Sequence, residues 1–353
     1  MNGRPDPLQV HDRLPEGLLA AAPQELHRLL GGPSLIHLPG RRGRPLFVSC
    51  LLHGNEHSGF LAIRDLLRAY RTKELPRPLS IFIGNVRAAE RNLRRLDDQP
   101  DFNRVWPGGD DRTSPEARIM AEVTETMRAR RPIASIDIHN NTGRNPHYAC
   151  INRLEREFLH LANMFGRLVV YFTEPHGVQS MAFADFCPAT TLECGHSGDP
   201  LGVEKAKTMV DACLHMDHLP TSAPHPQDLA VYHTIATVRV PADVGIGFGD
   251  ETADLCFPRS IEYWNFRELP EGTEFARQHP RLGNRIVLEV EDLDRHPATD
   301  RFFVYEAGLI RLTRTVIPSM LTRDETVIRQ DVLCYFMEEI VLSGLRDQNV
   351  AVA

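Results

Sequence analysis

Three side chains that can bind a metal ion lie at or just beyond the ends of apolar, strand-like segments. His53 and Glu56 follow the run 45–52, and His139 follows the run 133–138. The carboxyl ends of parallel strands meet at one edge of a sheet, which is where open α/β sheets bind their ligands. Two imidazoles and one carboxylate leave a zinc ion one open position for water, which is the catalytic arrangement. The pattern therefore predicts one zinc ion (Zn2+) per chain, held by His53, Glu56 and His139.

Each of these residues also has a simpler interpretation. An isolated His-x-x-Glu pair usually does no more than cap the helix that follows it, and a histidine at a strand end is often merely hydrogen-bonded. The metal interpretation depends on the third ligand at the end of a second strand. Asp137, two residues before His139, either orients that imidazole or is an ordinary buried aspartate. Cobalt, nickel or manganese would suit the same ligands.

A candidate general base, Glu193, directly follows a third strand-like run, 189–192. A carboxylate beside an activated water can take its proton and later deliver it to a leaving amine. Taken alone, Glu193 would more simply be a solvated glutamate at a strand end.

Polar and cationic residues follow the run 79–86. Asn103 and Arg104 are candidates for binding a substrate carboxylate, because a guanidinium group binds a carboxylate through two parallel hydrogen bonds. Arg94 or Arg95 could polarise a carbonyl group and stabilise its oxyanion. Both lie in an arginine-rich segment, so each could equally be a surface charge.

The loop 195–199 offers a competing chemistry. Its sequence, Gly-His-Ser-Gly-Asp, approaches the Gly-x-Ser-x-Gly turn that presents a nucleophilic serine. Asp199 fits the last position of that strained turn poorly. We therefore favour a wall of the site over a serine nucleophile for this loop.

Strands alternate with helices over the first 218 residues. Apolar runs predict strands at 34–38, 46–52, 79–86, 133–138, 167–172 and 189–193, and helices at 15–30, 58–70, 115–130, 154–165 and 203–218. Such alternation predicts an α/β fold: a mixed, mostly parallel sheet with helices on both faces. The Pro-rich segment 220–226 is linker-like, so we expect a catalytic domain over 1–218. A small β-rich domain over 219–353 should follow, ending in a helix near 324–345.

Composition narrows the class of protein. The chain has 353 residues, 42% hydrophobic and 25% charged, with a net charge of −7. The acidic balance disfavours a nucleic-acid partner, and no apolar run reaches the length of a membrane span. The seven cysteines are scattered without a C-x-x-C pair, which favours reduced thiols and a cytoplasmic location.

Four motifs in order make the chain similar to a known family. With 53–56 (His-Gly-Asn-Glu), 101–104 (Asp-Phe-Asn-Arg), 137–142 (Asp-Ile-His-Asn-Asn-Thr) and 191–193 (Thr-Leu-Glu), it resembles the succinylglutamate desuccinylase/aspartoacylase family of the zinc carboxypeptidase-like superfamily. The resemblance covers about 45–215, with a weaker match at 304–307. It implies zinc on His53, Glu56 and His139. It also implies the following roles: Glu193 as catalytic base, Arg94 or Arg95 at the scissile carbonyl, and Asn103, Arg104 and Asn140 at the substrate.

Two departures from the family separate this chain from the aspartoacylases. Aspartoacylases carry an arginine shortly before the strand that ends in the catalytic glutamate, whereas the segment 178–184 of this chain contains none. They also have a tyrosine after the Glu-Ala pair of the tail, where this chain has Gly308-Leu309-Ile310. A site without that cation and phenol should take a substrate with fewer anionic groups, or a more apolar one.

These observations favour a zinc-dependent deacylase that hydrolyses the amide bond of a small N-acyl amino acid or related amide. One alternative is a metallocarboxypeptidase acting on short peptides or cell-wall fragments. A second is a non-catalytic binding protein that kept the fold, although Glu193 would then have no purpose. The expected partner is a small molecule bearing a carboxylate. The sequence leaves a homo-oligomer open.

Overall fold

The computed structural model describes residues 6–220, 222, 224–283 and 285–342. The chain divides into two units. Among the described residues, the first comprises those within 6–140, 147–231 and 341–342, and the second comprises those within 141–146 and 232–340. The second unit thus takes in six residues that directly follow Asn140. The expected boundary between residues 218 and 219 stays a prediction, which limited proteolysis would test.

A mostly parallel sheet forms the centre of the first unit. Its strands lie in the order β1-β2-β4-β3-β5-β8-β6-β7. Their bounds are β1 (Gln9–His11), β2 (Ser34–Leu38), β3 (Leu46–Cys50), β4 (Leu79–Ile83), β5 (Ser135–His139), β6 (Tyr148–Ile151), β7 (Leu168–Tyr171) and β8 (Ala189–Glu193). Only the β2–β4 and β6–β8 pairs of this order are antiparallel. The predicted α/β class with a mixed, mostly parallel sheet is confirmed.

The order of the central strands creates a binding edge. From β3 the chain goes to β4 on one side and later to β5 on the other, and β4, β3, β5 and β8 all run parallel. Their carboxyl ends therefore share one edge of the sheet. Between β3 and β5 the order in which the chain adds strands reverses, although the two strands are parallel. Such a switch point opens a crevice in which α/β proteins bind ligands.

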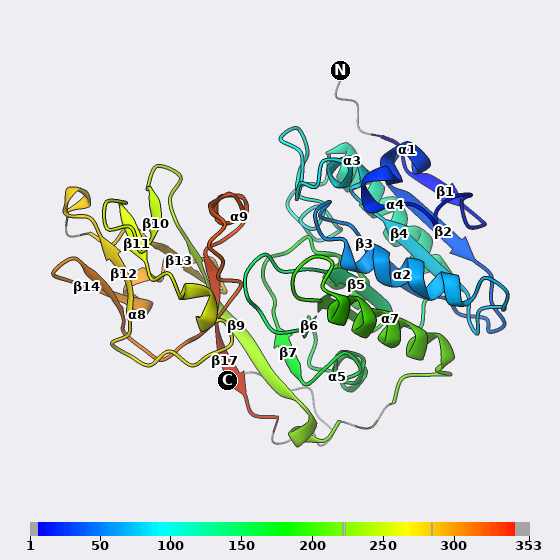
Figure 1. Ribbon diagram of the computed structural model, residues 1–353. Coiled ribbons are helices and arrows are strands. Elements are labelled where there is room, and N and C mark those ends of the chain that lie inside the picture. Colours follow the sequence, from blue (N-terminus) through cyan, green and yellow to red (C-terminus); the bar gives the residue numbers. More distant parts are fainter. Residues whose placement is uncertain (1–5, 221, 223, 284, 343–353) are drawn as a thin grey trace. The chain divides into compact units, whose positions relative to one another are not determined.

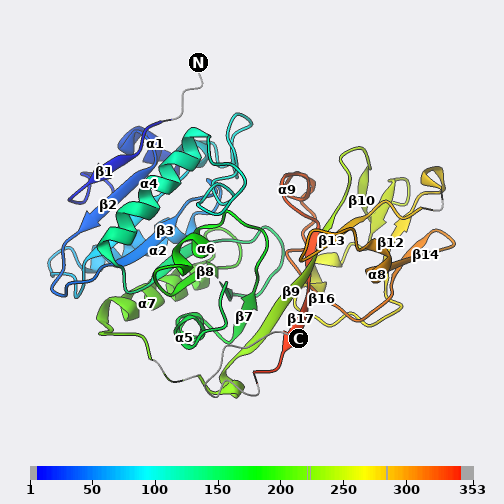
Figure 2. The same ribbon diagram turned by 180° about the vertical axis from the view of Figure 1, so that it is seen from behind.

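Helices cover both faces of this sheet. The helices of the first unit are α1 (Leu26–Leu30), α2 (Ser58–Ala69), α3 (Val86–Glu90), α4 (Pro115–Arg130), α5 (Arg156–Asn163), α6 (Gln179–Ala184) and α7 (Pro200–His215). Helices α2 and α7 lie side by side on the face seen in Figure 1, and α4 and α6 lie on the face seen in Figure 2. Gly59 allows α2 to approach the sheet closely, since a Cβ there would lie 2.7 Å from Cβ of Cys50.

The second unit is rich in β structure. Five strands pair in the order β10-β11-β12-β15-β14, while β13, β9, β17 and β16 form another run of neighbours. The bounds are β9 (Ala230–Arg239, beginning in the first unit), β10 (Ile246–Phe248), β11 (Leu255–Phe257), β12 (Glu274–Gln278), β13 (Glu289–Asp292), β14 (Phe303–Glu306), β15 (Leu309–Leu312), β16 (Ile317–Ser319) and β17 (Cys334–Ile340), with helices α8 (Thr299–Phe302) and α9 (Glu325–Gln330). Phe275, Phe303 and Phe336 pack together in its core.

Two expected helices are wrong in extent. The leading helix reduces to α1, preceded by a short 3-10 turn, because Gly17 takes φ +82° and Pro23 begins that turn. The final helix stops at Gln330, and the chain then forms strand β17, which pairs with β16. Its apolar spacing had a helical period, but sheet pairing in the second unit overrides local preference. Residues 343–345 of the expected helix lie outside the described residues.

Candidate metal centre

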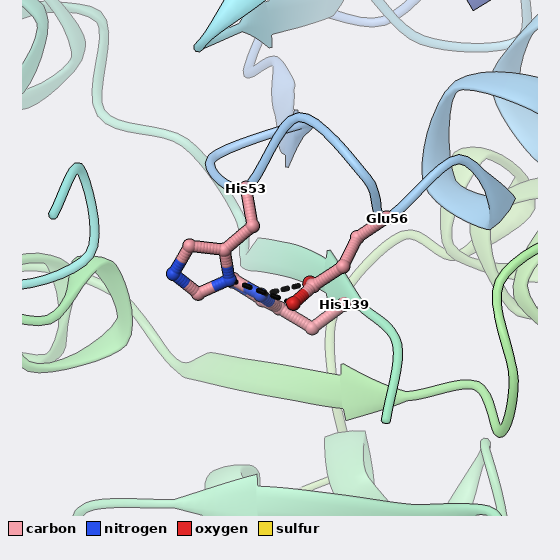
Figure 3. A group of neighbouring side chains, drawn as sticks. All are labelled: His53, Glu56 and His139. Carbon is pink, nitrogen blue, oxygen red and sulfur yellow. Dashed lines mark hydrogen bonds and ion pairs between the residues drawn. The ribbon is translucent and has the colours of Figure 1, made fainter. Parts of the chain in front are cut away.

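The predicted ligands meet at the carboxyl edge of the sheet. His53 and Glu56 lie in the turn between β3 and α2, and His139 ends β5, as Figure 3 shows. Nδ1 of His53 lies 2.7 Å from Oε1 of Glu56, and Nδ1 of His139 lies 2.7 Å from Oε2 of the same carboxylate. All three side chains are buried. Their ligand atoms lie within 4.8 Å of one another, as one small cation requires.

The glycine of the first motif has a steric cause. A Cβ at Gly54 would lie 2.2 Å from the backbone nitrogen of Ala89, in α3. Gly54 also donates its N–H to the carbonyl oxygen of Arg94. The turn that carries His53 and Glu56 therefore lies directly against α3 and the loop beyond it, and no larger residue fits at position 54.

Each ligand histidine is held from its other side by an aspartate. Nε2 of His53 lies 2.9 Å from Oδ1 of Asp101, and Nε2 of His139 lies 2.7 Å from Oδ2 of Asp137. A carboxylate only accepts hydrogen bonds, so each ring would carry its proton on Nε2 when a metal ion takes up Nδ1. This leaves Nδ1 of both rings directed at Glu56. Carboxylate-bound histidines of this kind are typical of metal ligands.

The charges at this site are strongly coupled. Burial acts to raise the pKa of Glu56, but His53 and His139 outweigh it and hold the pKa below its ordinary value. Burial acts to lower the pKa of His139, but Asp137 and Glu56 outweigh it and hold this pKa well above the ordinary value. The pKa of Asp101 lies well below its usual range, because His53 and Arg94 outweigh its burial. The fold thus keeps carboxylates ionised where positive charge is expected.

This donor set fits a divalent metal ion. It offers two imidazole nitrogens and one carboxylate, each buried, with the imidazoles oriented by Asp101 and Asp137. Three protein ligands of these types match catalytic zinc sites. Asp292, Asp294 and His296 form a second grouping, but Asp292 there already binds Arg301 at 2.8 Å, and the other two side chains are exposed.

Glu193 lies beside this centre. It ends β8 and pairs in register with His139 of β5, and paired residues point to the same face of a sheet. Burial is the main cause that raises the pKa of Glu193, to about 8; Glu56 and Asp137 raise it further, while His139 and Arg94 act against them. A carboxyl group whose pKa lies near neutrality can both accept and return a proton.

The structure separates the two candidate arginines. Arg94 donates to Oδ2 of Asp101 through Nε at 3.2 Å and Nη2 at 2.9 Å, and its Nη1 lies 3.8 Å from Oε1 of Glu56. Arg95 instead donates to the backbone oxygen of Gln99 at 3.0 Å. Gln99 is itself buried and bonds to Asn85. The extended loop before Asp101 therefore brings Arg94 to the metal centre and holds Arg95 away from it.

Asn103 lies at the centre, and Arg104 follows it directly. Nδ2 of Asn103 lies 3.3 Å from Nε2 of His139, and its Oδ1 accepts a hydrogen bond from the backbone nitrogen of Gln179 at 2.9 Å. Nη1 of Arg104 donates to the backbone oxygen of Asn103 at 2.9 Å, and the side chain of Arg104 is partly exposed.

Asn140 is occupied by the protein itself. Its Oδ1 accepts from the backbone nitrogen of Ser58, and its Nδ2 donates to Ser58 and to the backbone oxygens of Gly195 and His196. The side chain therefore ties the start of α2 to the loop 195–199. The expected contact of Asn140 with substrate stays a prediction.

The serine of that loop also has a structural contact. Oγ of Ser197 accepts a hydrogen bond from the backbone nitrogen of His57 at 2.9 Å. Asp199 caps α7 through the backbone nitrogen of Leu201 and also binds His147. These contacts fix the loop that follows Glu193, and its role as a wall of the site stays a prediction. Within the described residues, none of the helices is both long and apolar enough to span a bilayer.

Two side chains at the centre carried no role in the sequence analysis. Asp101 was recognised as part of a motif, but its contact with His53 was not foreseen. Ser49, which donates to Asp137 at 2.7 Å, gave no sequence signal beyond being a polar residue in an apolar strand. That single polar residue in β3 was the one clue available.

Comparison with known proteins agrees with the predicted resemblance. A sequence model of the succinylglutamate desuccinylase/aspartoacylase catalytic domain matches residues 42–218, half of the 353-residue chain. No curated protein matches the sequence.

Solved structures share the fold at low sequence identity. A succinylglutamate desuccinylase from Chromobacterium violaceum is 18% identical with a TM-score of 0.56, over 86% of this chain and 87% of that one. The enzyme of the same name from Vibrio parahaemolyticus is 14% identical with a TM-score of 0.56, over 87% and 86%. Murine aminoacylase 3 is 15% identical with a TM-score of 0.54, over 85% and 96%.

Proposed function

Because the chain belongs to the succinylglutamate desuccinylase/aspartoacylase family, we propose that it is a zinc-dependent deacylase. Its substrate would be a small N-acyl amino acid or a related amide. The observation that carries this proposal is the buried set of His53, Glu56 and His139 beside Glu193, at the carboxyl edge of the sheet.

The roles of the residues follow from their positions. A zinc ion held by the three ligands would act as a Lewis acid and activate a water molecule. Glu193 takes a proton from the attacking water and returns it to the leaving amine, because its carboxyl group lies beside the three ligands, in register with His139. Arg94 supplies positive charge at the oxygen on which negative charge develops, which is the usual way to stabilise such a transition state.

Substrate recognition is assigned to the loop 101–104. Arg104 binds the carboxylate of the amino-acid part, because it directly follows Asn103 and a guanidinium group can bind a carboxylate through two parallel hydrogen bonds. Asn103 contributes an amide next to His139. We assign Asn140 a supporting role, since its amide holds the loop 195–199 against α2.

The acyl part is expected to be uncharged. The segment 178–184 contains no arginine, and within it Gln179 and Ser180 are fully buried. An acyl carboxylate would need a cation to offset the cost of removing it from water. The proposed substrate therefore carries one carboxylate, on the amine side.

The alternatives make different forecasts. A carboxypeptidase with the same metal and base would hydrolyse short peptides or cell-wall fragments but not N-acyl amino acids. A binding protein would hold the metal and hydrolyse neither. A panel of both substrate classes separates the three.

The first test is metal content per chain, measured by elemental mass spectrometry on protein purified without chelator or histidine tag. We expect about one zinc per chain in the wild type and its loss in His139→Ala. Hydrolysis of N-acetyl amino acids should then depend on zinc and stop on chelation. Wild-type protein that stays metal-free when zinc is supplied would rule the proposal out.

We further propose a cytoplasmic location and no nucleic-acid partner. All seven cysteines are buried and unpaired, as is usual in a reducing compartment. The net charge of −7 offers little attraction for phosphates.

A further inference from the structure

A line of hydrogen bonds leads from the metal centre into the core of the first unit. Nε2 of His139 bonds to Oδ2 of Asp137 at 2.7 Å, and the hydroxyl of Ser49 donates to Oδ1 of Asp137 at 2.7 Å. We propose that Ser49 is a positioning residue for the metal: its hydroxyl fixes the Asp137 carboxylate, and through it the imidazole of His139, in the orientation that binds zinc. This inference rests on the proposed function.

The positions of the two residues support a direct coupling. Ser49 of β3 and Asp137 of β5 are paired in register on neighbouring parallel strands, and neither has any exposed surface. Paired residues point to the same face of a sheet, so the hydroxyl and the carboxylate are held together by the backbone. The contact therefore does not depend on a flexible loop.

The residue type is the second argument. The other residues of β3 are apolar: Leu46, Phe47, Val48 and Cys50. A hydroxyl buried among them costs free energy unless it is hydrogen-bonded, and the hydrogen bond it makes is to Asp137. A serine at this position contributes little to packing, so its value lies in that bond.

The bond has a consequence for His139. A buried carboxylate needs donors on both oxygens; here Ser49 serves Oδ1 and the imidazole serves Oδ2. When the hydroxyl is removed, Oδ1 loses this donor and the carboxylate can turn toward other donors. Nε2 of His139 would then be held less firmly, and Nδ1 would point less accurately at the site shared with Glu56.

The chain offers a matched control one strand away. Ser80 of β4 is 2% exposed and bonds to Nδ1 of His37 at 2.9 Å. Ser80→Ala removes the same hydroxyl from the same sheet and leaves another imidazole without its partner. It should lose comparable stability without reaching the metal centre.

The test is the zinc dissociation constant, measured by competition with a chromophoric chelator on full-length protein. We expect zinc binding to weaken about tenfold in Ser49→Ala, at the lower end of the effect of outer hydrogen-bond partners. Ser80→Ala should stay within about twofold of the wild type, while Asp137→Asn should lose at least as much affinity as Ser49→Ala.

A second pair of variants covers the case in which Ser49→Ala does not fold. Ser49→Thr keeps the hydroxyl group. Ser49→Val has the shape of the threonine variant but no hydroxyl group, so only Ser49→Val should weaken zinc binding. The inference would be overturned if Ser49→Ala bound zinc as tightly as the wild type or as Ser80→Ala. It would also be overturned if Ser49→Thr and Ser49→Val bound zinc equally well. Failure of the proposed function looks different, because the wild type itself would then bind no zinc.

Discussion

Nε2 of His53 lies 2.9 Å from Oδ1 of Asp101, on the side of the ring opposite to Glu56. The other oxygen of the same carboxylate accepts two hydrogen bonds from Arg94. Asp101 therefore joins a metal ligand to the arginine assigned to the scissile carbonyl. One side chain therefore contacts both a proposed metal ligand and the arginine proposed to stabilise the transition state.

Replacing Asp101 should affect both functions at once. We expect Asp101→Asn to weaken zinc binding about 10- to 100-fold, because the amide is a poorer acceptor for the proton on Nε2 of His53. The turnover number measured at saturating zinc should also fall, since Arg94 loses its bidentate partner. Asp98→Asn is the control, because Asp98 lies in the same loop and binds Arg87 at an exposed position. Unchanged zinc affinity in Asp101→Asn would contradict the assigned role.

The neighbouring arginines provide an internally matched experiment. Arg94→Ala should lower the turnover number about 100- to 1000-fold, the usual cost of losing one donor to a developing oxyanion. Arg95→Ala should change it little, because Arg95 binds the backbone oxygen of Gln99. Steady-state kinetics on one N-acyl amino acid would compare them, and the reverse order of effects would exchange the two assignments.

Glu193→Gln should separate metal binding from catalysis. The amide keeps the size of the side chain but cannot take a proton, so we expect a loss of about 100- to 10,000-fold in turnover number. Zinc content should remain at the wild-type level, since Glu193 is not among the three ligands. Activity equal to that of the wild type would remove the general-base mechanism.

His37 should make the stability of the first unit depend on pH. Burial, with help from Arg130, lowers the pKa of His37 to about 4 in the folded protein, whereas an unfolded histidine titrates near 6.5. The unfolded state therefore binds more protons between these values, so stability is lost as the pH falls from about 6.5 to about 4. The difference corresponds to at most about 3 kcal/mol.

Urea unfolding at pH 7 and pH 4.5 would measure this contribution. His37→Asn places an amide group near the position that Nδ1 occupies in the wild type, and this amide does not titrate in this range. The stability of the variant should therefore fall less with acid than that of the wild type. His218→Asn removes an exposed histidine and should behave like the wild type. Identical pH dependence in wild type and His37→Asn would show that His37 is not the cause.

Much of the metal centre could be predicted from the sequence, because its residues belong to strand ends. His139 and Glu193 terminate β5 and β8, and His53 follows β3 closely. Apolar runs predict strands, alternation with helices predicts parallel pairing, and parallel pairing brings carboxyl ends together. Convergence of these residues then follows without knowledge of any single contact.

Contacts between residues that are distant along the chain were decided only by tertiary structure. The sequence left Arg94 and Arg95 equivalent, and the packing of Gln99 against Asn85 separates them. The strand β17 exists because β16 is there to pair with it, although its apolar spacing had suggested a helix. Ser49 and Asp137 are 88 residues apart and meet only because β3 and β5 are neighbours. Local sequence patterns were therefore enough to predict the candidate site residues, whereas the orientation of each side chain depends on packing that no local pattern contains.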